Sequence, residues 1–238
     1  MNIATISVPQ LAVSFVPVGI VVFLMWRWNQ GHGRAIQAIA RMLLQLTLIG
    51  YVLVYIFQSE SGLVITGVLS VMLVAASWIA LNTVDLPKGA LFPSSLVSVT
   101  CGGGTTLLLI TQGVLRVDPW YEPSVIVPLA GMIFAASMTN ISLALERLHA
   151  EIRNGVDFYQ ARDKAFRTSM IPVVNSFLAV GLISLPGMMT GQILSGVSPL
   201  IAVRYQIMVM CMIFGAAGLS TVCFLVMIRK TAHFRAVP

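Results

Sequence analysis

Residues Asn175 to Leu194 read NSFLAVGLISLPGMMTGQIL. The run is apolar enough to cross a membrane, yet Pro186 stands next to Gly187 within it, and both residues disturb a helix backbone. Hydrocarbon cannot satisfy the backbone groups that such a break frees, so broken helices at membrane depth face protein or a wet cavity. A broken segment with polar flanks therefore indicates a translocation path. The alternative is that Gly187 and Gly191 form a GxxxG pair that serves only close helix packing.

The polar residues around the break are the candidate path residues. We expect the path to be lined by Asn175, Ser176, Thr190, Gln192 and Gln206, with Pro186-Gly187 as the flexible break. Arg204 is a separate case, because it stands near the start of the last apolar segment. Either it reaches the outer lipid headgroups, or it faces the cavity and attracts an anionic group of the substrate.

Composition places the chain among membrane proteins. Of its 238 residues 58% are hydrophobic and only 9% are charged, whereas soluble domains carry about 25% charged residues. We therefore expect an all-α, polytopic integral membrane protein, with residues 1–238 as one transmembrane domain. The net charge of +6 does not indicate nucleic-acid binding, because the basic residues lie in loops of one membrane side.

Seven segments are long enough to cross the hydrocarbon core, which takes about 20 apolar residues. They are Thr5–Trp26, Ile36–Phe57, Leu63–Leu81, Leu91–Leu115, Val125–Leu145, Thr168–Gln192 and Leu200–Ile228. An outside N-terminus and inside C-terminus would place 12 of the 14 Lys and Arg residues in the cytosol, as the positive-inside rule requires. These are Arg27, Arg34, Arg41, Lys88, Arg147, Arg153, Arg162, Lys164, Arg167, Arg229, Lys230 and Arg235.

One sizeable polar segment, residues 146–167, falls on the cytosolic side. Asn154-Gly155 marks a turn, and Asp157 is a plausible N-cap for a short helix after it. The spacing puts Phe158, Ala161 and Ala165 on one face, with Tyr159 and Phe166 on an adjoining one. Such a helix is suited to docking a soluble partner. The alternative is a helix that lies on the lipid headgroups.

The sequence lacks the residue patterns expected for ATP binding, proton coupling, catalysis or metal binding. The chain has no GxxxxGK[ST] motif, so it is not expected to bind ATP through a P-loop of its own. No Asp or Glu falls within a predicted span and the three histidines are cytosolic, which leaves proton coupling without a relay. We predict no catalytic residues and no metal site, and we interpret the 13 methionines as packing residues. The glycine run after Cys101 is expected to permit a kink or a tight helix contact.

The order of these features resembles a known family. SLPGMMTGQILSG (Ser184–Gly196), followed by Pro199 and by RYQI from Arg204, is similar to the signature of FetB-type ABC-transporter permeases. The family includes bacterial permeases associated with iron export and plant aluminium-tolerance proteins. Further similar stretches are RMLLQL from Arg41, LALERL from Leu143 and RTSMIPVVNS from Arg167. The similarity covers about Arg34 to Met227.

The resemblance implies a partner and a mechanism. A separate cytosolic ABC ATPase would hydrolyse ATP-Mg, and a homodimer of this chain would carry two such subunits in the bacterial inner (plasma) membrane. The coupling element would comprise Asp157, Phe158, Tyr159, Phe166 and Arg167. Iron, or a compound of it, is the substrate that the bacterial relatives imply. The alternative function is an ATP-independent channel or secondary carrier.

Overall fold

The structure is a computed structural model that describes residues 7–59 and 61–229. Its helices confirm the expected all-α class, and six helical segments in the described part are long and apolar enough to cross a membrane. The protein is therefore a multi-pass membrane protein. Thr5, Lys230 and Arg235, which entered the predicted first span and charge distribution, lie outside the described residues. The chain divides into two compact units, Met1–Gln58 and Ser59–Pro238.

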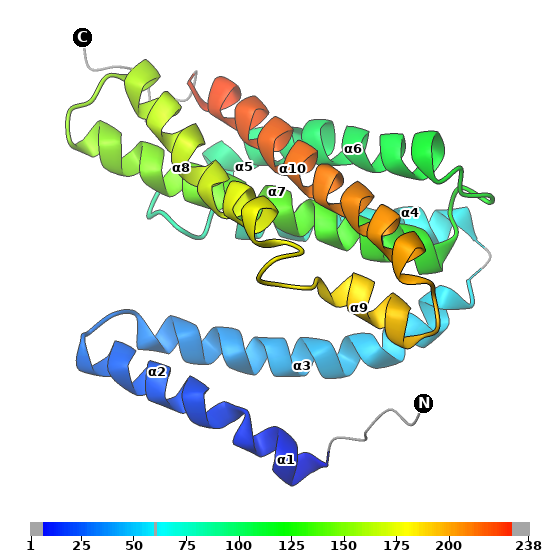
Figure 1. Cartoon of the computed structure of the whole chain (residues 1–238). Coiled ribbons are helices and arrows are strands. Elements are labelled where there is room, and N and C mark those ends of the chain that lie inside the picture. The colour runs from blue at the N-terminus through cyan, green and yellow to red at the C-terminus, as the bar shows by residue number, and fades with distance from the viewer. Residues whose placement is uncertain (1–6, 60, 230–238) are drawn as a thin grey trace. The chain divides into compact units, whose positions relative to one another are not determined.

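The first unit is a helical hairpin. α1 (Val8–Val13) leads into α2 (Phe15–Arg27), and α3 (His32–Phe57) follows after a short turn. Asn29 and Gly31 have φ angles of 54° and 53° in that turn, a left-handed conformation that glycine and asparagine tolerate best. Figure 1 shows α2 returning as α3 along its side. Most residues of the three helices are exposed, and Ile56 is buried.

The second unit holds the remaining helices. They are α4 (Gly62–Ile79), α5 (Lys88–Ser98), α6 (Thr105–Leu108), α7 (Pro123–Arg153), α8 (Phe158–Ala179), α9 (Gly187–Leu194) and α10 (Pro199–Ile228). Two π-helical stretches, Val99–Gly104 and Leu109–Val114, flank α6. As a result, Lys88–Val114 forms one continuous span.

The core of this unit forms where α7 and α10 pack together, with α8 beside both (Figure 1). Leu145 and Leu148 of α7 and Phe224 of α10 are completely or almost completely buried. Each buried aliphatic or aromatic side chain is worth about 1.5–3 kcal/mol in water. In a lipid environment the same contacts act through close packing, because lipid is as apolar as the core.

The glycine run forms a tight helix contact, as the sequence predicts. A Cβ atom on Gly102 would lie 2.3 Å from the Ser220 backbone nitrogen and 2.4 Å from its Oγ. Ser220 Oγ lies 2.9 Å from Ser137 Oγ, to which it donates a hydrogen bond. The π-helical stretch, α7 and α10 therefore meet around small residues, and only glycine fits at position 102.

The predicted span Thr168–Gln192 is broken, but its boundaries differ from the expected ones. α8 ends at Ala179, and residues 180–186 separate it from α9. Gly181 has a φ of 81°, and its backbone N–H donates to the Ser184 carbonyl at 3.0 Å. Pro186 is the N-cap of α9 and not a kink within a helix. The break is wider because a left-handed glycine and a closed turn precede the proline.

The short cytosolic helix predicted after Asp157 is not a separate element. It forms the first turns of α8, which runs without interruption from Phe158 to Ala179. The expected N-cap is confirmed, because the Asp157 carboxylate accepts the backbone N–H of Tyr159 at 2.9 Å. Phe158, Ala161 and Ala165 do share one face, as predicted, and the structure shows that this face is buried: Phe158 is 7% exposed, and Ala161 and Ala165 are fully buried. The predicted short helix is therefore part of one 22-residue helix.

Candidate functional site

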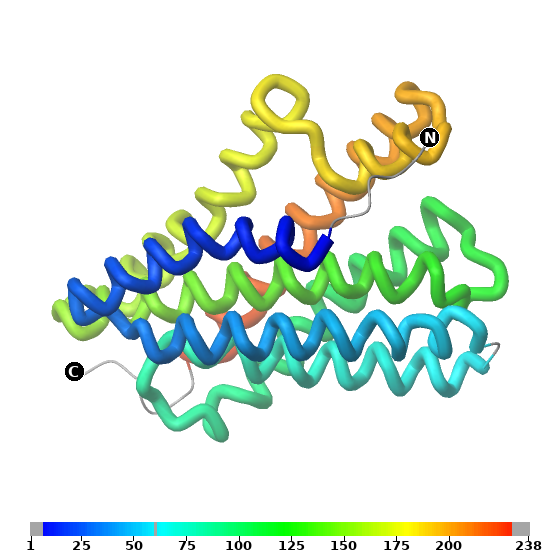
Figure 2. Tube along the Cα trace, turned by 90° about the horizontal axis from the view of Figure 1, so that it is seen from below, coloured from blue at the N-terminus to red at the C-terminus, as the bar shows by residue number. Residues whose placement is uncertain are grey.

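A cavity of about 360 Å³ lies beside the broken segment. Its walls come from the end of α8, the connection 180–186, α9 and α10. Figures 1 and 2 show why these parts meet: the chain leaves α8, makes a loop and continues as α9, and α10 then runs back with its first turns beside α9. The lining is mostly apolar, with Phe177, Met189 and Met210 among its larger side chains.

α10 presents one continuous face to this cavity. Val203, Gln206, Ile207, Met210 and Cys211 all line it, and their spacing of three, four, seven and eight residues is that of one helix face. Arg204 stands two residues before Gln206, about 200° away around the helix. It is exposed and does not line the cavity. This position agrees with the headgroup alternative for Arg204.

Gln206 is the one amide in the cavity wall. The residue is only 7% exposed, and its Oε1 atom has no hydrogen-bond partner among residues 7–59 and 61–229. A buried amide oxygen without a donor destabilises the folded state by about 1–3 kcal/mol. Retaining such a group beside a cavity is typical of a site whose partner arrives from outside, as water or as a ligand.

The other predicted path residues differ in their hydrogen bonds and in their exposure. Thr190 Oγ1 donates to the Pro186 carbonyl at 3.1 Å, and Ser176 Oγ donates to the Val173 carbonyl at 2.7 Å. Gln192 also has a buried Oε1 without a partner. Asn175 and Gly187 are exposed. Of the predicted path set, the structure brings Pro186 and Gln206 into the cavity wall; the path role of the set stays a prediction.

Sequence reasoning missed most of the cavity lining. Phe177, Met189, Met210 and Cys211 are wall residues that we did not single out, because polarity was the criterion. The helical spacing around Gln206 could have identified Met210 and Cys211. Phe177 and Met189 could not be found in this way, because the geometry of the connection 180–186 decides where they lie.

The described part of the chain has no group of three or more His, Cys, Asp or Glu side chains that could hold a metal ion. Sulfur is nonetheless present in the cavity wall, from Met189, Met210 and Cys211. Thioether and thiol groups are soft ligands. They also serve as adaptable packing groups.

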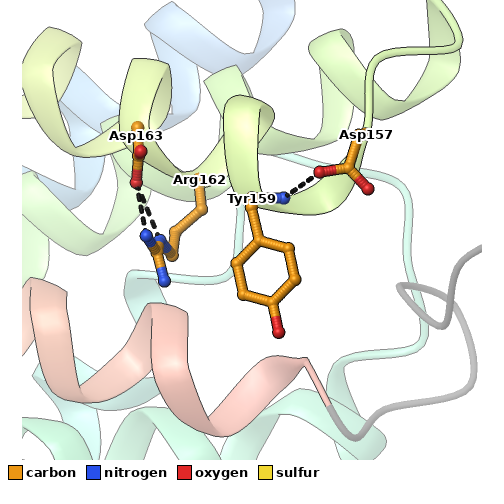
Figure 3. A network of polar contacts seen from close by, with 4 residues as sticks. All are labelled: Asp157, Tyr159, Arg162 and Asp163. Atoms are coloured by element: carbon orange, nitrogen blue, oxygen red, sulfur yellow. Dashed lines mark hydrogen bonds and ion pairs between the residues drawn. The ribbon is translucent and has the colours of Figure 1, made fainter.

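The first turns of α8 form the candidate coupling site. Tyr159 is 45% exposed, and the Arg162 and Arg229 guanidinium carbons lie 5.3 Å and 4.8 Å from its ring centroid. Arg162 also pairs with Asp163 at 2.7 Å. Figure 3 shows Tyr159 projecting from the capped first turn of α8, with the Arg162–Asp163 pair beside it. Both guanidinium contacts are within cation–π range.

The remaining residues of the coupling set differ in how far they are exposed. Phe158 is buried, and Phe166 packs on the buried cluster of Met170, Val173 and Ala217. Arg167 is exposed. Tyr159 is therefore the aromatic residue of this set that is most accessible to a partner.

Ion pairs fasten the start of α8 to the end of α7. Lys164 Nζ lies 2.8 Å from Glu151 Oε2, and Arg147 pairs with the other oxygen of the same carboxylate. The Glu151 side chain is only 9% exposed, whereas its two partners are about half exposed. Removing both cations would leave the mostly buried Glu151 carboxylate without compensation.

The fold and the site define a polytopic α-helical membrane protein with a cavity beside an interrupted helix. The chain belongs to UPF0014, a family described as uncharacterised, whose model matches residues 8–233. A UPF0014 membrane protein of Synechocystis, slr1647, is 35% identical over 85% of this chain and 84% of its own length.

Two further relatives have functional names. "Probable iron export permease protein FetB" of Escherichia coli is 35% identical over 79% of this chain and 78% of its own length. "Protein ALUMINUM SENSITIVE 3" of Arabidopsis thaliana is 32% identical over 89% of this chain and 82% of its own length. No solved structure matches.

Proposed function

We propose that this chain is the permease subunit of an ATP-driven exporter. The observation that carries the proposal is the cavity between α8, α9 and α10, with the unpaired Gln206 oxygen in its wall. In many secondary transporters, interrupted helices that border a cavity form the substrate site. The similarity to an iron export permease supports the same class of function.

The energy would come from a separate cytosolic ABC ATPase that binds ATP-Mg. α8 is suited to transmit its motion, because one helix begins at the exposed Tyr159 and ends at the cavity. A displacement of the first turns of α8 would then also shift the other end of the same helix, which lines the cavity. Permeases of this type act in pairs, so a homodimer in the inner membrane is part of the proposal.

Iron, or a complex of it, is the substrate that the FetB relative supports. The transport direction is outward in the same proposal, with the N-terminus outside and the C-terminus in the cytosol. Asn175, Ser176, Thr190 and Gln192 would join Gln206 along the path when the connection 180–186 changes conformation.

The test is flux of iron across proteoliposomes that contain the chain with or without its cognate ABC ATPase. We expect transport only with the ATPase and ATP. Full-rate flux without ATP would contradict the proposal and would instead identify a channel or secondary carrier. A Walker-motif lysine variant of the ATPase is the matched control, because it keeps the complex and removes hydrolysis.

A further inference from the structure

The wall of the cavity between α8, α9 and α10 limits what the cavity can hold. Among the described residues that line it, none has a charged side chain or a hydroxyl group, and Gln206 supplies the one amide. The volume of about 360 Å³ falls within the range of small-molecule sites, about 300–1,000 Å³. The wall therefore suits a small apolar molecule, and Gln206 decides which polar group that molecule carries.

The Gln206 side chain requires a hydrogen-bond donor. The residue is more than nine-tenths buried, and no group in the described ranges donates to its Oε1 atom. A carbonyl oxygen of an amide only accepts hydrogen bonds, and leaving a buried acceptor unpaired is unfavourable. The matching occupant of the cavity therefore carries an N–H or O–H group.

Neither water nor a lipid tail meets this requirement well. A buried water molecule typically makes two to four hydrogen bonds to polar groups, whereas one amide is all that the side chains of this wall offer. A lipid acyl chain fits an apolar wall but has no donor, so the Gln206 oxygen would stay unpaired beside it. An apolar molecule with one donor satisfies both the wall and the amide.

A bare metal ion fits this wall poorly. The ion would lose its hydration shell, and a wall without charge cannot compensate for that loss. Met189, Met210 and Cys211 offer sulfur, but ions that prefer sulfur do not select an amide oxygen. The Gln206 oxygen is thus not explained by a soft metal, and the methionines act as an adaptable apolar surface.

The wall is held in place by contacts within the second unit. The Phe177 ring, near the end of α8, lies with its centroid 5.4 Å from that of Phe214 on α10. The turn that follows α8 is closed by the hydrogen bond from the Gly181 N–H to the Ser184 carbonyl. Phe177 therefore presents an aromatic side chain to the cavity from a fixed position, which favours a flat apolar group as its neighbour.

We propose that this cavity binds a neutral, largely apolar organic molecule that donates one N–H or O–H hydrogen bond to Gln206 Oε1. The inference rests on the proposed function and specifies its substrate class. Iron would cross only as part of a neutral complex with such a molecule, and not as a bare ion.

The test compares two probes that differ only in the donor. They are β-naphthol and its methyl ether, which share the same ring system, although only the naphthol has an O–H group. The full chain is placed in phosphatidylcholine nanodiscs without any ATPase, and calorimetry measures binding after subtraction of partitioning into empty nanodiscs. Ferrous ion under anaerobic conditions is the third probe. We expect the naphthol to bind about 5-fold more tightly than the ether, the effect of one neutral hydrogen bond, and ferrous ion not to bind.

Three variants assign the preference to this cavity. Gln206→Leu should remove the difference between the two probes, and it is expected to fold because it replaces an unpaired buried amide with an apolar side chain. Gln112→Leu is the matched control, since Gln112 lines a separate cavity beside α6; the difference should persist there. Met210→Trp should weaken binding of both probes, because the larger side chain fills the cavity.

Equal affinity of wild type for the two probes overturns the inference, because the cavity is then a plain apolar pocket that an acyl chain could fill. Absence of any binding overturns it too, as does a preference that survives in Gln206→Leu, undiminished naphthol binding in Met210→Trp, or Gln206-dependent binding of ferrous ion. A Gln206-dependent preference without ATP-driven iron flux would refute the proposed function and leave the ligand class standing. Flux without the preference would do the reverse.

Discussion

Arg229, at the end of α10, lies with its guanidinium carbon 4.8 Å from the ring centroid of Tyr159 in the first turn of α8. The contact joins the last turn of the helix that lines the cavity to the segment proposed to meet the ATPase. Together with the Lys164–Glu151 ion pair, it ties the end of α7, the start of α8 and the end of α10 to one another. These three helices are thus connected at the end where an external motor would act.

Tyr159→Ala should uncouple ATP hydrolysis from transport. The substitution removes two cation–π contacts, each worth about 0.5–1 kcal/mol at an exposed site, and the most accessible aromatic side chain of the coupling segment. We expect several-fold less substrate moved per ATP hydrolysed, with little change in melting temperature. Tyr159→Phe keeps the ring and is the control. Equal loss in both variants would contradict a role for the ring.

Gln206→Met should separate stability from function. The side chains are similar in size, and the substitution removes a buried oxygen that has no partner in the chain. We expect the chain to gain about 1 kcal/mol in stability, measured as a higher melting temperature in detergent, while transport falls. A variant that transports normally would show that the amide does not contact the substrate. Loss of stability would show that the oxygen has a partner within the protein.

Gly181→Ala should disturb the connection between α8 and α9. The φ of 81° at Gly181 costs an L-residue about 1–2 kcal/mol, although no atom lies within 4 Å of the added Cβ. Gly191→Ala is the matched control, because the space around it is equally open and no left-handed φ is involved. We expect Gly181→Ala to lower transport in vesicles and Gly191→Ala to preserve it. Equal loss of transport in the two variants would mean that the added methyl group, and not the left-handed backbone conformation at Gly181, causes the loss.

Gly102→Ala should damage the core directly. The new methyl group would stand 2.3 Å from the Ser220 nitrogen, and this backbone atom cannot move without displacing α10. Overpacking of this kind typically costs about 1–3 kcal/mol and sometimes more. Gly104→Ala is the control, since its nearest neighbour lies at 3.9 Å. Size-exclusion profiles and melting curves of the two variants check the prediction; similar curves would contradict it.

Local features of the sequence were sufficient for much of this fold. Long apolar runs predict membrane-spanning helices because hydrocarbon requires every backbone group to be paired within the segment. Asp157 predicts a helix start, because a carboxylate can accept the free N–H groups of the first turn. Pro186 and Gly187 predict a break in the helix because both residues disturb a helix backbone. The length of the connection 180–186 was not predicted.

Tertiary structure alone decided which of these local features meet. Gln206 and Phe177 share a cavity wall, Arg229 reaches Tyr159, and Gly102 touches Ser220. Each pair comes from segments far apart in the chain, and their approach depends on how small and large side chains fit between packed helices. Periodicity along one helix reports which face is apolar and carries no information about the neighbour that covers it. The sequence therefore determined which segments are helical and some of the helix ends, such as the start of α8 at Asp157, and packing determined the site.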